Sequence, residues 1–374
     1  MKKNYIVAKD ISRWKLDNKF ENFLSYKADK SEFWKRIYVW YYKIFDHKYY
    51  KTGLEFIKKE IDRQRPNIDS HYPLSDSFLI RDMIYSLHRY GASFNDYFFF
   101  KFYDLNYRGK EKFNTLKQQY GFCSVANAPS VRNLCDDKIE TYNRFKQYFK
   151  RDVIAVTTDK DLNKANDFIN KHSKLILKPI RGHSGEGIKI LASDEINDDL
   201  IFNYVRKGGL IMEELIIQDS RMAALNSSCI NTVRLATFND GKQLNIFGAA
   251  LRMGRAGAIV DNAGAGGIFA TLDPEYGMII KRATDLQSNY YVVHPDSAVT
   301  IPGFKIPEWN EAIKMLKQMA EEIPEGKLLA WDLALSEKGW CLVEINDIGD
   351  QHMFQYADIV GKKALLFDYI KTLK

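Results

Sequence analysis

The stretch AWDLALSEKGWCLVEIND, residues 330–347, predicts a β-hairpin with two acids and an amide on one face. A turn centred on Lys338 places Asp332 directly opposite Glu344, and Asn346 lies two residues further along the same face. Both acids stand within apolar segments, so a solvated hairpin edge is the weaker interpretation. Two carboxylates and an amide oxygen that converge there would repel one another without a cation. Hard oxygen ligands of this type suit Mg²⁺ shared with phosphates.

Basic charge and aromatic side chains gather in the first third of the 374-residue chain. Residues 1–120 hold 24 Lys and Arg against 15 Asp and Glu, a net charge of +9, and 29 of the 51 Phe, Trp and Tyr residues. The whole chain carries +7, so residues 121–374 carry −2. Apolar residues at helical spacing predict that residues 1–120 are mainly helical. This region is either a helical core with a solvated basic face or a surface for an acidic partner. Lys35 and Arg36 are the first candidates for contact with such a partner.

The composition excludes several classes of protein. We find no apolar run long enough for a transmembrane helix and no apolar segment typical of a signal peptide near the start. We also find no RNP motif or zinc-finger spacing, so we expect no nucleic-acid partner. The four cysteines lack CxxC spacing and are expected to be reduced thiols of a cytoplasmic protein. They are Cys123, Cys135, Cys229 and Cys341.

A glycine-rich turn at 182–187 follows a predicted strand that ends near Lys178. Glycines let backbone N–H groups approach a phosphate, and the lysine supplies a point charge. The turn is not a P-loop, because Ile188 follows Gly187 and no helix is predicted to begin there. A plain flexible hairpin turn is the alternative. Strands and helices alternate from about residue 121 onward, which indicates an α/β or α+β architecture.

Arg234 and Arg252 lie inside apolar predicted strands, where an arginine seldom lacks a partner. The partner is either an acid of the protein or a phosphate or carboxylate held by the planar guanidinium. Asp261 and Asn262 follow these strands and could position such groups. His294 lies in a predicted loop, and we expect it to be structural rather than a catalytic base.

The order of these motifs resembles the ATP-grasp superfamily. The phrases NTVRLATF, ALRMG, VDNAGAGGI, HPD and WDLAL…VEIN are most similar to its sugar-transfer-associated branch. The resemblance covers about residues 125–374 and implies an α+β ATP-grasp fold, in which two α/β lobes grip ATP after a mainly helical N-terminal region. The expected domains are a helical region at 1–124, a first lobe at 125–212 and a C-terminal catalytic lobe at 213–374.

The resemblance implies which residues bind ATP and Mg²⁺. Lys138 and Lys178 are expected to hold the nucleotide phosphates, while the hinge residues Met212 and Glu213 read adenine. Asp219 is the expected ribose contact. The loop that closes over the phosphates comprises Gly182, His183, Ser184, Gly185 and Gly187. The implied magnesium ligands are Asp332, Glu344 and Asn346.

The resemblance also implies the reaction. Arg234 and Arg252 are expected to stabilise the transferring phosphoryl group or an acyl phosphate, with Asn231, Asp261 and Asn262 near the acceptor. The implied enzyme is an ATP-dependent ligase that forms a C–N bond and releases ADP and phosphate. Its substrates are an amine and the carboxylate of an acidic sugar from a cell-surface polysaccharide or its precursor. Phosphorylation by ATP turns such a carboxylate into an acyl phosphate that an amine can displace.

Two other functions stay open. A kinase that phosphorylates a sugar hydroxyl would use the same nucleotide site, but it would need no amine. A nucleotide-dependent binding module would have lost catalysis, and the presence of both lysines and all three implied metal ligands argues against it. We expect a cytoplasmic location, with at most peripheral contact with membrane-bound glycan machinery.

Overall fold

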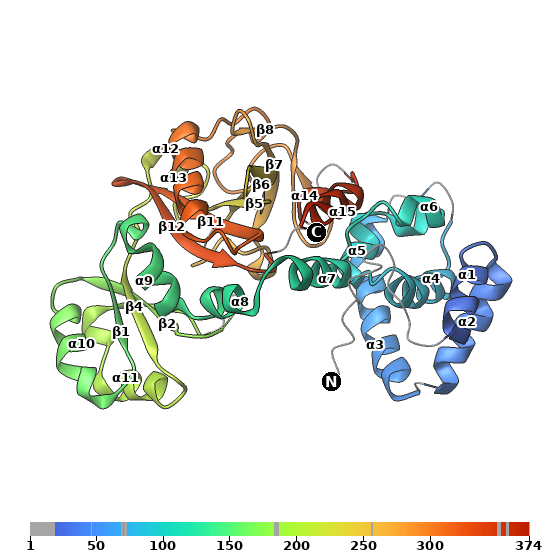
Figure 1. The fold of residues 1–374 in the computed structure, drawn as a ribbon, viewed down its shortest axis with the longest axis horizontal. Coiled ribbons are helices and arrows are strands. Elements are labelled where there is room, and N and C mark those ends of the chain that lie inside the picture. Colours follow the sequence, from blue (N-terminus) through green and yellow to red (C-terminus); the bar gives the residue numbers. More distant parts are fainter. Residues whose placement is uncertain are drawn as a thin grey trace. The chain divides into compact units, whose positions relative to one another are not determined.

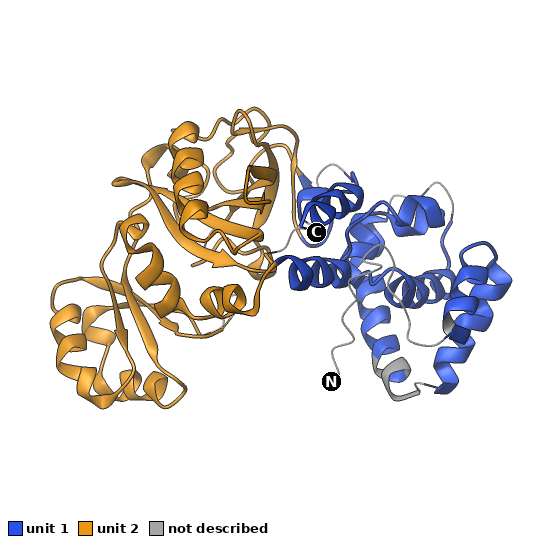
Figure 2. Ribbon diagram, in the orientation of Figure 1, with its two compact units in different colours: residues 1–126, 286–290, 350–374 blue, residues 127–285, 291–349 orange. Residues whose placement is uncertain are grey.

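A computed structural model describes residues 19–45, 47–68, 70, 73–182, 187–255, 257–349, 353–356 and 359–373. The chain divides into two units, shown in different colours in Figure 2. The helical unit comprises residues 1–126, 286–290 and 350–374, and the sheet unit comprises residues 127–285 and 291–349. The three-domain division expected from the sequence stays a prediction.

Helices dominate the helical unit, as the sequence predicts (Figure 1). They are α1 (Lys19–Ala28), α2 (Glu32–Phe45), α3 (His47–Gln64), α4 (Asp76–Arg89), α5 (Phe94–Phe99), α6 (Tyr107–Lys110), α7 (Leu116–Ala126), α14 (Met353–Tyr356) and α15 (Lys363–Thr372). The short 3-10 helices are η1 (Arg65–Asn67) and η2 (Phe102–Asp104). Ser75 caps α4, because its hydroxyl accepts a hydrogen bond of 3.3 Å from the backbone N–H of Phe78.

The aromatic residues of α5 and η2 form a core. Phe100 and Phe102 are fully buried, and Phe100 stacks on Phe113 with ring centroids 4.4 Å apart. The C-terminal helix α14 joins this core, since Tyr356 stacks on Phe99 at 4.1 Å. The first and last parts of the chain therefore share one hydrophobic interior in the helical unit.

The sheet unit contains a four-stranded antiparallel sheet in the order β1-β4-β2-β3. Its strands are β1 (Val153–Val156), β2 (Lys174–Pro179), β3 (Lys189–Ala192) and β4 (Leu210–Glu214). The helical elements beside it are η3 (Asp159–Asp161), α10 (Leu162–Ile169), η4 (Ser193–Glu195) and α11 (Asp198–Val205), whereas α8 (Pro129–Asp136) and α9 (Lys138–Phe149) pack against the larger sheet. Apolar residues of α10 and α11 pack with the strand residues Leu175, Leu177 and Met212 in one core.

An eight-stranded sheet forms the rest of the sheet unit, with the path β10-β9-β7-β6-β5-β11-β12 and β8 paired to β7. The strands are β5 (Val233–Asn239), β6 (Leu244–Met253), β7 (Ile268–Asp273), β8 (Met278–Ile279), β9 (Ala283–Thr284), β10 (Tyr290–Tyr291), β11 (Leu328–Ser336) and β12 (Gly339–Asn346). The remaining helical elements are α12 (Ser220–Ala223), η5 (Ala263–Ala265) and α13 (Trp309–Glu322).

Alternation along β11 separates an apolar face of the large sheet from a polar one. Leu329, Trp331, Leu333 and Leu335 belong to the core that also contains the buried side of α13. Asp332 therefore points to the opposite face. The α+β fold class is confirmed. Within the described residues, no helix combines the length and hydrophobicity that crossing a membrane would need.

Candidate active site

The pairing of Asp332 with Glu344 is confirmed, although the predicted turn geometry is not what produces it. Ser336 pairs with Gly339 at the hairpin turn, and a regular register continued from this pair would place Asp332 opposite Val343. The register instead shifts by one residue between Leu333 and Asp332, as a β-bulge does. The bulge therefore restores the carboxylate pair that an unbroken hairpin would have lost.

Two arginines hold Asp332, which is 1% exposed. Arg234 lies opposite Asp332 on β5 and donates from Nε to Oδ1 and from Nη2 to Oδ2, at 2.7 Å each. Arg252 on β6 adds an ion pair of 3.3 Å. Burial alone would raise the pKa of Asp332, but the two arginines outweigh it and hold the pKa below its ordinary value. The arginines thus supply positive charge for which the sequence argument had invoked only a metal ion.

Glu344 and Asn346 are half-buried on β12, on the same face as Asp332. The side-chain nitrogen of Asn346 is buried beside Asp332 and helps to lower the pKa of that carboxyl. No three His, Cys, Asp or Glu side chains among the described residues are grouped so that they could hold a metal ion. Two carboxylates and one amide still fit Mg²⁺ that takes its other ligands from water and phosphates.

A second acid, Asp261, lies in the loop after β6 and contacts Arg252. Asp261 accepts hydrogen bonds from the backbone N–H of Thr232 at 2.8 Å and from its hydroxyl at 2.5 Å. Arg252 donates from Nε to the Thr232 hydroxyl at 2.9 Å and forms an ion pair of 3.3 Å with Asp261. Asn262 caps η5 by accepting from the N–H of Gly264 at 3.1 Å. Asp261 therefore orients Arg252, whereas Asn262 shapes the next turn.

Asn231 lies inside the protein and organises the loop before β5. It is 0% exposed and donates to the carbonyls of Met222 and Asn226 and to Oε1 of Gln218, at 2.9 to 3.0 Å. Its own side-chain oxygen is buried without a hydrogen bond in the described part of the chain. The sequence analysis missed Gln218, which also receives the backbone N–H of Asn231 at 2.6 Å.

Lys178 and Glu213 meet on the four-stranded sheet. Lys178 donates to Oε1 of Glu213 at 2.7 Å, and Arg151 donates from Nε to Oε2 at 2.7 Å. Glu213 is 2% exposed. Burial would raise the pKa of Glu213, but Arg151 and Lys178 outweigh it and lower the pKa to about 2. Both carboxylate oxygens are occupied, so this side chain positions Lys178.

Lys138 opens α9, and Asp137 is the N-cap of this helix. Its ammonium donates to the carbonyl of Gly182 at 2.9 Å. Burial lowers the pKa of Lys138 and Lys178 lowers it further, while Glu344 and Glu213 raise it. Glu344, which belongs to the other sheet, thus acts electrostatically on Lys138.

The glycine-rich turn joins β2 and β3. Gly182 and Gly187 have φ of +146° and +73°, values that favour glycine. A Cβ on Gly187 would stand 2.8 Å from the Pro179 ring, so the turn also needs glycine for space. The predicted nucleotide-binding residues His183, Ser184 and Gly185 lie outside the described residues.

The two remaining residues predicted to contact the nucleotide, Met212 and Asp219, both interact with other parts of the protein. Met212 is fully buried in the core of the four-stranded sheet, and its strand β4 pairs there with β1 on one side and with β2 on the other. Asp219 caps α12 and accepts two side-chain hydrogen bonds of 2.8 Å from Arg221. His294 accepts backbone N–H bonds at Nδ1 and contacts the Gly254 carbonyl through Nε2 at 3.0 Å, which agrees with the structural role expected for it.

Arg151 and Thr232 are the main site residues that the sequence analysis missed. Arg151 stands in the short connection after α9, where an isolated basic residue is ordinary, and its ion-pair partner is 62 residues away. Thr232 directly precedes the strand of Arg234, and only its contact with Asp261 distinguishes it from any strand threonine.

Comparison with models of known protein families gives a match to the part of the chain that contains these motifs. The family model described as sugar-transfer associated ATP-grasp matches residues 117–368, which is more than half of the chain. No curated protein sequence matches this chain.

Solved structures similar to the chain include D-alanyl-alanine synthetase A from Vibrio cholerae, with 13% identity, a TM-score of 0.42, and coverage of 66% of this chain and 67% of that one. The ATP-grasp ligase PsnB, complexed with minimal precursor, Mg and ADP, has 11% identity, a TM-score of 0.41, and coverage of 71% and 69%. D-Alanine-D-Alanine ligase from Helicobacter pylori has 14% identity, a TM-score of 0.41, and coverage of 66% and 61%. These similarities are distant, and the family match stands without them.

Proposed function

Because the chain belongs to the sugar-transfer-associated ATP-grasp family, we propose that it is an ATP-dependent carboxylate–amine ligase. Its proposed substrates are an amine and the carboxylate of an acidic sugar from a cell-surface polysaccharide or its precursor. A cytoplasmic location is part of this proposal, because the reaction consumes ATP. The product would be an amide, with release of ADP and phosphate.

One observation supports this proposal most. Strand pairing sets Asp332, Glu344 and Arg234 side by side on the polar face of the large sheet, and Arg252 contacts Asp332 from β6. Fixed positive charge beside carboxylates is the arrangement that phosphoryl transfer needs, because this chemistry depends mainly on positioning and on neutralisation of charge. The reaction requires no nucleophilic Ser or Cys.

The first step makes the sugar carboxylate reactive. A carboxylate is a poor acyl donor because oxide is a poor leaving group. A carboxylate oxygen attacks the γ-phosphorus of ATP, the bond to the bridging oxygen breaks, and ADP leaves with that electron pair. Lys138 and Lys178 would hold the phosphates, and Glu213 holds the Lys178 ammonium in place. Mg²⁺, when bound by Asp332, Glu344 and Asn346, would neutralise charge on the phosphate oxygens.

The second step forms the amide. The amine nitrogen attacks the carbonyl carbon of the acyl phosphate, the carbon–oxygen bond to phosphate breaks, and the nitrogen loses a proton. Arg234 and Arg252 would stabilise the negative oxygens, since their guanidinium groups stay charged. Asp261 keeps Arg252 in position, and Asn231 and Asn262 shape the loops beside it. Closure of the 182–187 loop would exclude water from the acyl phosphate.

Trapping of the acyl phosphate tests the mechanism. The full chain is incubated with ATP, Mg²⁺ and a panel of acidic sugars, with hydroxylamine in place of the natural amine. We expect a sugar hydroxamate and ADP from at least one acidic sugar, and no hydroxamate from the matching neutral sugar. A screen of acidic sugars against amines for ADP release then identifies the substrate pair.

The same experiment separates the alternatives. A stable sugar phosphate ester, formed without an amine, would replace the ligase by a kinase of sugar hydroxyls. ATP binding without ADP release across the whole panel would favour a binding module. The control variant Glu337→Gln removes a charge from the exposed turn of the same hairpin and should leave hydroxamate formation unchanged.

A further inference from the structure

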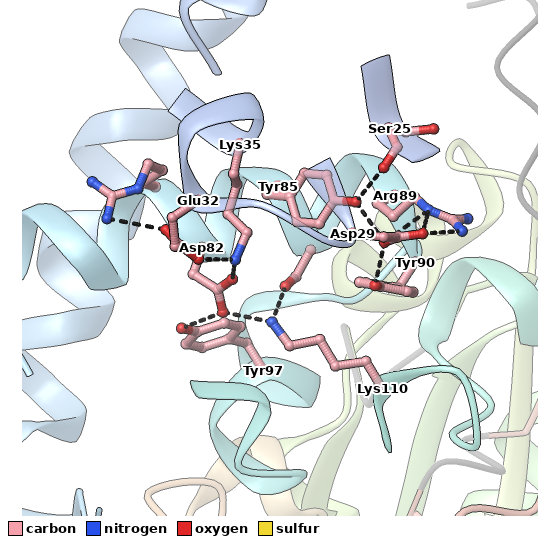
Figure 3. Close-up of polar contacts among 12 residues, drawn as sticks. Ser25, Asp29, Glu32, Lys35, Asp82, Tyr85, Arg89, Tyr90, Tyr97 and Lys110 are labelled. Atoms are coloured by element: carbon pink, nitrogen blue, oxygen red, sulfur yellow. Dashed lines mark hydrogen bonds and ion pairs between the residues drawn. The ribbon is translucent and has the colours of Figure 1, made fainter. Parts of the chain in front are cut away.

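The helical unit contains a pocket of about 260 Å³ that lies between α2, α4 and the segment around α6. Charged side chains line it, and Lys35 and Lys110 approach the same carboxylate, that of Asp82 (Figure 3). This volume is close to the lower limit for small-molecule sites. The proposed catalytic residues all lie in the sheet unit, so the pocket is a separate feature of the molecule.

Two ammonium groups share one buried acid at the bottom of this pocket. Lys35 donates to Oδ1 of Asp82 at 2.9 Å, and Lys110 donates to Oδ2 at 2.6 Å. The Tyr97 hydroxyl also donates to Oδ2, at 3.0 Å. Glu32 accepts from Lys35 at 2.5 Å, but its side chain is 51% exposed. Of these two carboxylates, Asp82 is therefore the buried one, and it contacts both lysines.

The lysines have more N–H donors than their partners use, although Asp82 and Glu32 together balance their two charges. Asp82 and Glu32 outweigh burial and raise the pKa of Lys35. Burial, together with the charge of Lys35, outweighs Asp82 and lowers the pKa of Lys110. Each ammonium has three N–H donors and makes two hydrogen bonds within the described residues, those of Lys110 going to Asp82 and Ser86. A second anion would satisfy both remaining donors.

A neighbouring acid in the pocket wall does not satisfy these donors, because it is paired with its own cation. Asp29 accepts from Nε and Nη2 of Arg89 at 3.0 and 2.6 Å and from the hydroxyls of Tyr85 and Tyr90 at 2.6 Å. Figure 3 shows these groups beside the Asp82 cluster. The wall is therefore a fixed, neutral and hydroxyl-rich surface.

We propose that this pocket binds the carboxylate of an acidic monosaccharide unit between the ammonium groups of Lys35 and Lys110. Aromatic rings suit the rest of such a ligand: Phe78 and Tyr107 line the pocket and can pack against a sugar ring. The pocket is too small for a nucleotide or a long polymer segment. The sugar class rests on the proposed function, and the site would recognise the acceptor glycan without taking part in catalysis.

Calorimetry of the full chain without ATP tests this site, with D-glucuronate as the probe. D-Glucose is the control for the ring alone, and inorganic phosphate is the control for another anion. We expect glucuronate to bind, glucose not to bind, and Lys35→Gln to weaken glucuronate binding by at least about tenfold. The matched variant Lys43→Gln removes the same charge from an exposed position on α2 and should bind like the wild type.

A second variant covers the case in which Lys35→Gln does not fold. Leu105→Trp adds volume at the pocket wall and removes no charge. It should also lose glucuronate binding, with an unchanged circular dichroism spectrum. Equal affinity in Lys35→Gln and Lys43→Gln, or preferential binding of phosphate, would overturn the proposal.

Arg252→Gln distinguishes this pocket from the sheet unit. Glucuronate binding that survives Arg252→Gln and is lost in Lys35→Gln supports the pocket, even if no acidic sugar gives ADP release. Binding lost only in Arg252→Gln would overturn the pocket and leave the proposed ligase function intact.

Discussion

The sheet unit and the helical unit each bury one carboxylate between two cations, but they use different cations. In the sheet unit, Asp332 is held by Arg234 and Arg252. In the helical unit, Asp82 is held by Lys35 and Lys110. Arginine keeps its charge in any protein environment, whereas a buried lysine can lose its proton. The first arrangement therefore provides permanent charge beside a reaction, and the second leaves N–H donors that a ligand can use.

Glu213 is intermediate between these two cases, because one arginine and one lysine hold it. Arg151 and Lys178 bind its two oxygens at equal distances of 2.7 Å. The lysine is the partner expected to contact the nucleotide, and the arginine is fixed by the carbonyls of Phe149 and Leu342. Asp332, Glu213 and Asp82 thus form a series, with two arginines, one arginine and one lysine, and two lysines as their partners. Replacement of each acid by its amide is expected to change the stability by graded amounts.

Removal of the acid at the two ends of this series should give the largest difference. Asp332→Asn removes the buried carboxylate that both arginines share, although Arg252 keeps Asp261, and should lower the free energy of unfolding by about 3–5 kcal/mol. Asp82→Asn should cost less, about 1–3 kcal/mol, because Lys110 can become neutral. Urea unfolding followed by circular dichroism measures both. Equal losses would contradict the contrast between arginine and lysine.

Glu213, the middle member of this series, is best examined through the pH dependence of stability. The pKa of Glu213 is lowered from 4.5 to about 2, so its pairing stabilises the fold above pH 4.5 and this contribution is lost as pH falls towards 2. The shift corresponds to about 3 kcal/mol. Glu213→Gln should be less stable at neutral pH but should lack this part of the pH dependence. Unfolding free energies measured between pH 5 and pH 2.5 compare the two proteins, and identical slopes would contradict the pairing.

Glu344 differs from these acids because it is half-buried and lies beside the implied metal site. Glu344→Gln should reduce ADP release by about 100-fold, since a ligand for charge neutralisation is lost. The free energy of unfolding should change by less than about 0.5 kcal/mol. Glu337→Gln in the same hairpin is the control. Near-normal turnover of Glu344→Gln with Mg²⁺ would remove this residue from the site.

The smallest effect is expected at Arg36, which the sequence analysis grouped with Lys35. Arg36 is exposed on α2, whereas Lys35 contacts Asp82. Arg36→Gln should weaken glucuronate binding by less than about twofold, and this difference should shrink as salt rises. Calorimetry at low and high salt measures it. A loss as large as that of Lys35→Gln would show that surface charge, and not the pocket, attracts the sugar.

The strand pattern made much of the sheet unit predictable. Alternating apolar residues around Asp332 and Glu344 predicted a hairpin with both acids on one face. The sequence also offered the acid pairing of Arg234 as one of two alternatives, and that alternative is the one observed. Such features depend on residues near one another along the chain or directly across a strand.

Only the tertiary structure decided the rest. The bulge beside Asp332, the contact of Arg151 with Glu213 and the meeting of Lys35, Asp82 and Lys110 have no local pattern. The sequence alone determined which segments are strands and which faces are apolar, because the backbone repeat acts on neighbouring residues. Packing decided which charges share a buried acid, because the partners of Asp82 stand 47 and 28 residues away on separate helices and meet only when those helices pack.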